Sequence, residues 1–547
     1  MMDEENLSHD SSSSASAKTY RDLEDDKKWK QILIALAISY ICISGGNLIG
    51  YTSSAIPSIR TGSSVPFLRI LENEITMESK DVSLTDVTYR IQEIDNILES
   101  TGSEKVETTR LNNCNKEFAE LTDSQASWIG GLGPLGAFFG SLLAPIPIKI
   151  LGPKGVILKL GSYVYVLSWF ITALAPNLSY IYISRFLGGL AMGTTFSAVP
   201  IYIVETASLK LRGPLGTLSQ FLFTIGVLMS FVFGYFLDFR TSALVSGLVV
   251  LPNFIILPFI PESPTWLLSK KKIGEAECAF RKIRGFSMEE FQQLSHHRIS
   301  LDDDVDSASN YSAKQRSSKS LLRSPKEVRS IFVVMFLCIF QQLTGINAVN
   351  FYTVTIFEIA AGGNSFLDGH SSAILVALVF CLANVCSYLL IERLGRKCLL
   401  IVSTTFISLS AFSLGTYFYL LETEYDTSSL SFVPLASLVT FVLAFSIGYG
   451  PLLYVIVAEV LSSRVRSVVT PVAVGVNWLC VFLVAKTFPG LLQALQAYGA
   501  FWMYGSFSVV SLLFTIAFVP ETKGKSEKQI QDFFVNNNKS VPSTVAA

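Results

Sequence analysis

The chain has 547 residues, of which half are hydrophobic and 16% are charged, and its formal net charge is −1. Its mean hydropathy of +0.46 and its low charge content differ from those of soluble domains, which are roughly one quarter charged, so lipid is the expected solvent. The near-neutral charge excludes the basic field that nucleic-acid binding needs.

The N-terminal tail, residues 1–30, is serine-rich and charged. It lacks the apolar core and cleavage site of a secretory signal, so we expect a disordered tail that stays in the cytosol.

Apolar stretches long enough to cross about 30 Å of hydrocarbon as helices follow this tail. They predict an all-α membrane protein with twelve transmembrane helices, six in a first half (31–261) and six in a second half (330–519). The stretches are approximately 31–57, 126–148, 156–176, 180–204, 213–236, 241–261, 330–361, 371–391, 398–421, 432–458, 467–489 and 498–519.

The cations of the short loops predict the orientation, because cytosolic loops carry an excess of Lys and Arg. Both chain ends, the linker 262–329 and the tail 520–547 are then cytosolic, and the long segment 58–124 is extracellular. Helical spacing of apolar residues from Val87 to Leu98 indicates one amphipathic helix in that segment. The loop cations are Lys149, Lys154, Lys210, Arg212, Arg393, Arg396, Lys397, Arg464 and Arg466.

An internal repeat relates the two halves. Glu205 precedes Arg212 by the same interval as Glu459 precedes Arg466, and Pro-Glu-Ser at 261–263 recurs as Pro-Glu-Thr at 520–522. An even number of helices per half restores the same orientation, so the halves should be parallel repeats that rock about a central site.

A cluster of amide side chains points to the chemistry of that site. Gln341, Gln342, Asn347 and Asn350 crowd one end of a predicted helix. An amide presents two donors and one acceptor, which suits a neutral ligand rich in hydroxyl groups. Polar groups at that depth imply a partner or a wet cavity. The alternative is that they only bond neighbouring helices to each other.

Several motifs together resemble the sugar porter family of the major facilitator superfamily, which includes facilitative glucose transporters and insect trehalose transporters. They are Pro200-Ile201-Tyr202 to Glu205, Arg212-Gly213, Pro261-Glu262-Ser263-Pro264, Gln341 to Asn347, Glu392 to Lys397, Asn477-Trp478 and Pro520 to Gly524. The resemblance implies the major facilitator fold.

The resemblance also implies which residues bind the sugar and which form the gate. The expected sugar contacts are Gln220, Gln341, Gln342, Asn347, Tyr454, Asn477 and Trp478. Ion pairs that hold the cytosolic side shut are expected from Glu205, Arg212, Glu262, Glu392, Arg396, Glu459 and Arg466.

The sequence departs from the family at several positions. The first-half latch departs from the family's charged pattern at Lys149, Pro153 and Thr265, so we expect the second half mainly to hold the cytosolic gate. Phe380 replaces a common Asn. Thr52 stands where proton-coupled members carry Asp, so facilitated diffusion is favoured over symport.

Other readings carry less weight. Residues 131–136 match a dinucleotide-binding fingerprint, but they lie in an apolar span with Pro134 inside it, so close helix packing is the better account. We expect no metal, no cofactor and no catalytic residues, hence no enzyme.

The sequence therefore predicts a uniporter of a hexose or trehalose at the plasma membrane that works by alternating access. Its partners are a small-molecule sugar and the lipid bilayer, without nucleic acid, and the oligomeric state stays open. A sugar sensor or receptor with a transporter fold is the alternative.

Overall fold

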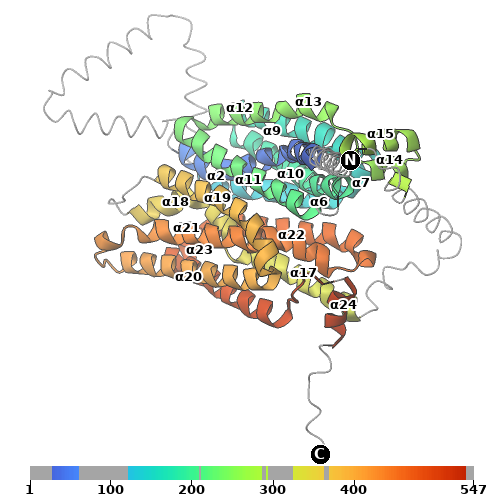
Figure 1. Ribbon diagram of the computed structural model, residues 1–547. Coiled ribbons are helices and arrows are strands. Elements are labelled where there is room, and N and C mark those ends of the chain that lie inside the picture. Colours follow the sequence, from blue (N-terminus) through green and yellow to red (C-terminus); the bar gives the residue numbers. More distant parts are fainter. Residues whose placement is uncertain are drawn as a thin grey trace, which may run out of the picture.

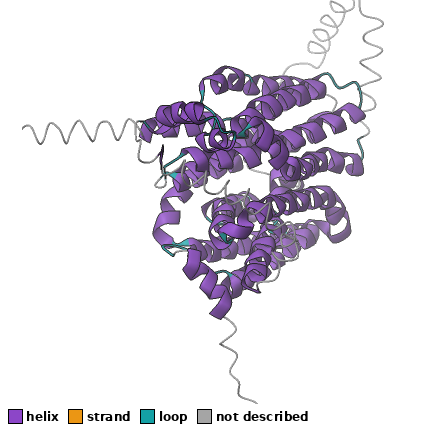
Figure 2. Cartoon of the chain, turned by 90° about the vertical axis from the view of Figure 1, so that its right-hand side faces the viewer, coloured by secondary structure: helices purple, strands orange, loops and turns teal. Residues whose placement is uncertain are grey.

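The computed structural model describes residues 28–60, 121–208, 211–285, 291–292, 325–361, 369–525 and 527–536. Figure 2 shows only helices and loops in this part of the chain. The expectations for the N-terminal tail and for the amphipathic helix near Val87 lie outside it.

The all-helical membrane fold is confirmed. Eleven helical segments of the described chain are long and apolar enough to cross a membrane. The longest, Val469–Phe518, contains two crossings, because Gln496 has a non-helical backbone with φ 57° and ψ 174°. The rings of Phe488 and Tyr504 lie 6.4 Å apart, whereas the same stretch of straight helix would span about 24 Å. Twelve crossings result.

The first half begins with the span Lys28–Ile59, which includes α2 (Ile41–Arg60). A capping box starts α6 (Asp123–Leu143). Thr122 Oγ1 accepts from the Gln125 backbone N–H, and Gln125 Oε1 accepts from the Thr122 backbone N–H. Further elements are α7 (Pro145–Leu151), α8 (Pro153–Val156), the π-helix η2 (Ile157–Ser162), α9 (Tyr163–Ala173), α10 (Leu178–Thr206), α11 (Arg212–Phe236), α12 (Phe239–Val250), α13 (Pro252–Ile256) and η3 (Leu257–Phe259).

The second half repeats this arrangement after two short linker helices, and its first crossing begins at Pro325, earlier than predicted. The linker helices are α14 (Pro264–Ser269) and α15 (Ile273–Arg284). The second half contains α17 (Pro325–Leu343), α18 (Ile346–Ala361), α19 (Gly369–Leu394), α20 (Arg396–Glu422), η5 (Ser428–Leu430), α21 (Val433–Ile447), α22 (Tyr449–Val460) and α23 (Ser463–Phe518), and α24 (Glu527–Asn536) follows it.

The two halves form two layers of roughly parallel helices, the first half blue to green and the second half yellow to red (Figure 1). One end of the bundle, which we call the basic end, carries Lys149, Lys154, Arg396 and Arg466, together with α14, α15 and α24. The other end, where α6 and α19 begin, is called the opposite end. By the positive-inside rule the basic end is expected to be cytosolic.

Matching carboxylates cap one helix of each half at the basic end. Glu262 accepts from the backbone N–H groups of Lys154 and Gly155, both at 3.1 Å. Glu521 accepts from those of Arg396 at 3.1 Å and Lys397 at 3.0 Å. A carboxylate at a helix N-terminus satisfies orphan donors and the helix dipole, so both repeats use the same device.

The fingerprint-like segment of α6 serves close packing, as expected. A Cβ on Gly189 of α10 would lie 1.9 Å from the carbonyl oxygen of Gly133. Only glycine permits this backbone approach.

Candidate substrate cavity

A cavity lies between the two halves and is lined by residues of both. All seven residues predicted to contact the sugar line it, so the structure brings Gln220 of the first half to the same space as the amides of the second. The lining residues are Ile49, Phe196, Gln220, Phe223, Gln341, Gln342, Ile346, Asn347, Asn350, Phe380, Phe445, Gly450, Tyr454, Asn477, Trp478 and Val481.

A break between α17 and α18 places the amide cluster on both sides of a turn. Gly345 has φ +91°, a conformation that a side chain rarely adopts, and a Cβ there would lie 2.8 Å from the Tyr504 ring. Gln341 and Gln342 therefore end one helix while Asn347 begins the next.

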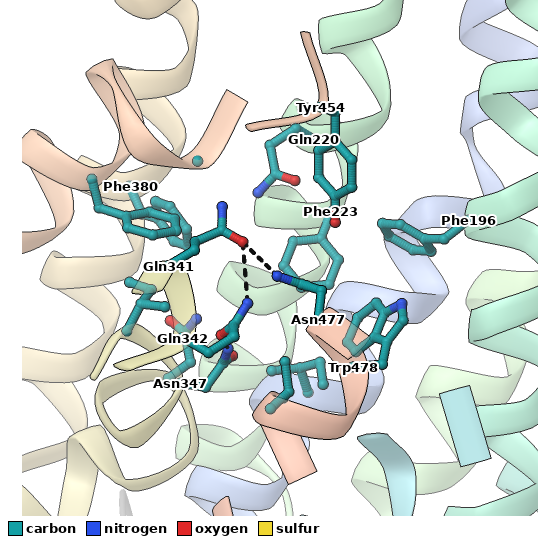
Figure 3. Close-up of a pocket in the computed structure, with 16 residues that line it drawn as sticks. Phe196, Gln220, Phe223, Gln341, Gln342, Asn347, Phe380, Tyr454, Asn477 and Trp478 are labelled. Atoms are coloured by element: carbon teal, nitrogen blue, oxygen red, sulfur yellow. Dashed lines mark hydrogen bonds between the residues drawn. The ribbon is translucent and has the colours of Figure 1, made fainter. Parts of the chain in front are cut away.

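The amides form a connected network (Figure 3). Gln341 Oε1 accepts from Asn477 Nδ2 at 2.9 Å and from Gln342 Nε2 at 3.1 Å. Gln341 Nε2 donates to the Tyr449 carbonyl at 2.9 Å. Asn347 Nδ2 in turn donates to Gln342 Oε1. A chain of this kind fixes which donors and acceptors stay available.

Two amides are unengaged. Among the described residues, neither Gln220 of α11 nor Asn350 of α18 has a hydrogen-bond partner. Asn477 uses both amide hydrogens, on Gln341 Oε1 and on the Cys338 carbonyl at 3.2 Å, which leaves its own oxygen available. The cavity therefore offers donors and acceptors from both halves, as a polyol requires.

Aromatic rings form the remaining walls. Phe196 lies edge-on to Trp478 at 6.0 Å and to Phe223 at 5.6 Å, so rings from both halves meet here. Phe380 faces Phe445 at 6.4 Å on another wall. Apolar ring faces suit the C–H face of a pyranose.

Exposure differs among the residues that line the cavity. Tyr454 of α22 is 40% exposed, whereas Gln341 and Gln342 are 4% exposed. Trp478 Nε1 is buried without an acceptor in the described chain, so it is a further donor at the wall.

A buried cation lies beside Thr52. Arg185 of α10 donates to the Leu48 carbonyl at 2.7 Å, to the Ile129 carbonyl at 3.2 Å and to Thr52 Oγ1. Within the described residues its partners are these neutral oxygens and the Tyr51 ring, 5.5 Å away, and no carboxylate. Arg185 thus joins α2, α6 and α10, and none of its described partners is a carboxylate that could transfer a proton.

The predicted gate residues occupy the basic end. Arg396 of α20 pairs with Glu459 of α22 at 3.2 Å, and Arg466 donates to the Leu461 carbonyl at 2.8 Å. Glu205 accepts from Ser263 Oγ. Glu262 caps α8, and the side chains of Arg212 and Glu392 lie outside the described part. The Arg396–Glu459 pair is internal to the second half, so gating by these groups stays a prediction.

Sequence reasoning missed the aromatic walls contributed by Phe196, Phe223 and Phe445, and it missed Arg185. A phenylalanine within an apolar helix is as apolar as its neighbours, so no sequence pattern indicates that it lines a cavity. Arg185 could have been found, because a charge in the middle of a span is a functional candidate by default.

Comparison with known proteins shows which family contains this arrangement. The model of the "Sugar (and other) transporter" family matches residues 9–534. The facilitated trehalose transporter Tret1 of Culex quinquefasciatus is 36% identical over 412 residues, which are 75% of this chain and 78% of that protein. Tret1 of Bombyx mori is 34% identical, over 75% and 79%.

The match to Tret1 of Anopheles gambiae is 35% identical and covers 75% of this chain but 51% of that longer protein. Among solved structures, the xylose transporter XylE of E. coli in a partially occluded inward-open conformation is similar, with a TM-score of 0.63, 23% identity and coverage of 90% of this chain and 99% of that one. This likeness concerns the fold.

Proposed function

This chain belongs to the sugar transporter family of the major facilitator superfamily, and we propose that it carries a sugar across the plasma membrane by facilitated diffusion. Family members are multi-pass membrane transporters, so the chain is not an enzyme. The finer claims, which are uniport, alternating access, the membrane and the cytosolic position of both ends, belong to the proposal.

The observation that carries the proposal is the composition of the cavity between the halves. Gln220 from the first half and the amides of α17, α18 and α23 from the second face one space. A ligand that bonds both sides is released when the halves rock apart at either end, which is the geometry that alternating access needs. We assign the seven predicted cavity residues to sugar binding on this basis.

Trehalose or a hexose is the substrate class that we propose. The relatives named above are described as trehalose transporters, and their identity to this chain exceeds that of the solved structures. Phe380 removes a polar group at the wall opposite Trp478, so selectivity should rest on the amide network and on ring stacking.

The surroundings of Thr52 support uniport over proton symport. Its hydroxyl accepts from Arg185, and the described contacts of that guanidinium include no carboxylate. Coupling to protons requires a group that gains and loses a proton during the cycle. We therefore expect uptake to be indifferent to an imposed proton gradient at zero membrane potential.

Counterflow in proteoliposomes tests the proposal. Vesicles are loaded with unlabelled trehalose, glucose or fructose, and entry of the labelled sugar is followed. A carrier produces a transient overshoot for its own substrate, which Asn477→Leu abolishes and the exposed variant Thr487→Ala preserves. Absence of overshoot with every sugar, or accumulation driven by a proton gradient, contradicts facilitated diffusion.

A sugar sensor is the second candidate, favoured by the first-half latch, in which Lys149 replaces the family's usual Asp and Thr265 replaces its usual Arg. A sensor binds the sugar without exchanging it. Saturable sugar binding to protein that gives no counterflow would support the sensor over the carrier.

A further inference from the structure

A set of contacts joins the two halves at the opposite end, away from the predicted gate. There the first turns of α6 meet the second-half helix α23. We call the residues of this contact the α6–α23 clasp, and they are Asp123, Ser124, Ser127, Trp128, Phe482, Lys486 and Gln493.

Lys486 makes three of these contacts. Its Nζ donates to Ser127 Oγ at 2.7 Å and to the Ser124 carbonyl at 3.4 Å, and it lies 4.6 Å from the centroid of the Trp128 ring. Trp128 also packs against Phe482, with ring centroids 6.1 Å apart. The ammonium is therefore held by a hydroxyl, a carbonyl and a ring face of the other half.

A second polar contact lies beside the first. Gln493 Nε2 donates to Asp123 Oδ2 at 2.8 Å. Nearby, Ser53 of α2 accepts the backbone N–H of Val354 at 3.3 Å, which the non-helical residue Tyr352 releases from the α18 hydrogen-bond ladder. Two helix pairs thus close the same end of the interface.

Lys486 is out of place for a residue that only anchors the chain. It lies within the apolar span Val469–Phe518 and at the end where the short loops are poor in cations. In the described chain it forms no ion pair with a carboxylate. These contacts are partly open to solvent, so they join the halves while the interface is closed, and water can replace the neutral partners of Lys486 when it opens.

We propose that the α6–α23 clasp holds the opposite end shut and that Lys486 sets the balance between the two cavity orientations. The inference rests on the proposed alternating access. Opening toward this end must separate α6 from α23, so every clasp contact breaks. The Arg396–Glu459 pair differs, because both partners belong to one half.

The test measures access to the cavity in the full-length protein. Ile49, which lines the cavity from α2, is changed to Cys, and labelling by a membrane-impermeant maleimide is timed from the face that carries the clasp. The same protein without Ile49→Cys gives the background of the native thiols. Losing the ammonium contacts in Lys486→Met should raise the labelling rate about tenfold.

Matched variants separate the clasp from general loosening. Ser127→Ala and Gln493→Ala should raise the rate less, and Lys486→Arg should stay near the parent, because a guanidinium also donates and stacks. The neighbour Thr487, which bonds its own helix at the Leu483 carbonyl, should be silent as Thr487→Ala. Melting temperatures show which variants are folded.

Labelling of Lys486→Met at the parental rate, or equal acceleration by Thr487→Ala, overturns the proposal. If Lys486→Met does not fold, Ser127→Ala and Gln493→Ala decide, and parental rates in both overturn it. Labelling does not depend on which sugar is carried. Accelerated labelling without counterflow would therefore keep the clasp and reject the carrier.

Discussion

Gln341 occupies a different position from the other cavity amides, because its hydrogen-bonding capacity is directed almost wholly at the protein. Its oxygen accepts two amide hydrogens, and its nitrogen holds the Tyr449 carbonyl. Gln220 makes no hydrogen bond within the described chain. The first residue should therefore order the site, and the second should contact the ligand directly.

Substituting the two glutamines separates these roles. Gln341→Met removes the partner of the buried Tyr449 carbonyl and the acceptor of two amides, so we expect a loss of about 1–3 kcal/mol in stability and weaker sugar binding. Gln220→Met should leave the melting temperature unchanged and raise Kd about tenfold. Thermal unfolding with and without sugar measures both effects. A Gln220→Met protein that melts early, or a Gln341→Met protein that melts normally, contradicts this assignment.

The two capping glutamates should differ in their response to pH. Burial raises the pKa of Glu262, and its backbone hydrogen bonds do not fully offset that effect. Burial also acts on Glu521, but the backbone N–H groups of Lys523, Arg396, Lys397 and Thr522 outweigh it and hold the pKa below its usual range. Ionisation of Glu521 therefore stabilises the fold, whereas protonation of Glu262 stabilises it.

Glu521→Gln should consequently lower the free energy of unfolding at neutral pH by at most about 1 kcal/mol after solvent screening, and the melting temperature with it. A folded pKa below the unfolded value gives stability that is present above about pH 4.3 and is lost as the pH falls through the folded pKa. The deficit of Glu521→Gln should thus shrink on acidification. Wild-type protein should meanwhile gain from Glu262 as the pH falls toward its unfolded pKa. A deficit that stays constant as the pH falls from 7 to well below about 4.3 would refute the prediction for Glu521.

At the residue scale, the sequence revealed those residues whose polarity differs from that of their apolar neighbours. Gln341, Asn347 and Asn477 stand out because amides are costly in lipid, and the structure places all three at the cavity. Their mutual hydrogen bonds could not be foreseen, because rotamers depend on the packing of other helices. Phe196 and Phe223 resemble any lipid-facing ring in the sequence.

At the scale of elements, α2 and α11 pack so closely that side chains are excluded. A Cβ on Gly46 would lie 1.8 Å from the Phe223 carbonyl oxygen, and one on Gly226 would lie 2.0 Å from that of Ile43. Phe223 also lines the cavity. The spacing of these helices therefore fixes one wall of the site.

Gly46→Ala should force α2 away from α11. We expect a loss of about 2 kcal/mol or more in stability, together with reduced sugar binding, because Phe223 moves with the contact. Gly490→Ala is the matched control, since a Cβ there meets nothing within 4 Å and alanine favours the helix. Melting temperature and sugar affinity are measured for both. Equal behaviour of the two variants would mean that the close approach is unimportant.

Hydropathy located the crossings because length and apolar content suffice to define them. It did not locate breaks inside them. The π-helix over Ile157–Ser162 interrupts the predicted crossing 156–176, whereas the turn at Gln496 lies in the gap between the predicted crossings 467–489 and 498–519. A break such as the π-helix arises where tertiary packing overrides local preference.

At the scale of the whole molecule, the cavity exists only where the halves meet. Trp478 of the second half packs on Phe196 of the first, and Tyr235 of α11 lies 6.4 Å from His370 of α19. Together with the α6–α23 clasp, these contacts join the halves directly. The repeat in the sequence predicted two parallel halves, but not which side chains touch, because that depends on how the repeats face each other.

Direct contact between the halves predicts that the covalent connection is dispensable. Residues 1–300 and 301–547, expressed together as two chains, should copurify and retain at least about a tenth of the counterflow of the intact protein, because α6–α23 and α2–α18 contacts do not need the linker. Without the linker, each half loses the high effective concentration of the other half. Confinement of both chains to the same membrane partly restores it. Either chain alone should bind no sugar, since Gln220 and the amides of α17 and α23 would be separated. Sugar binding by residues 301–547 alone would move the site into the second half and remove the reason for the halves to rock around the ligand.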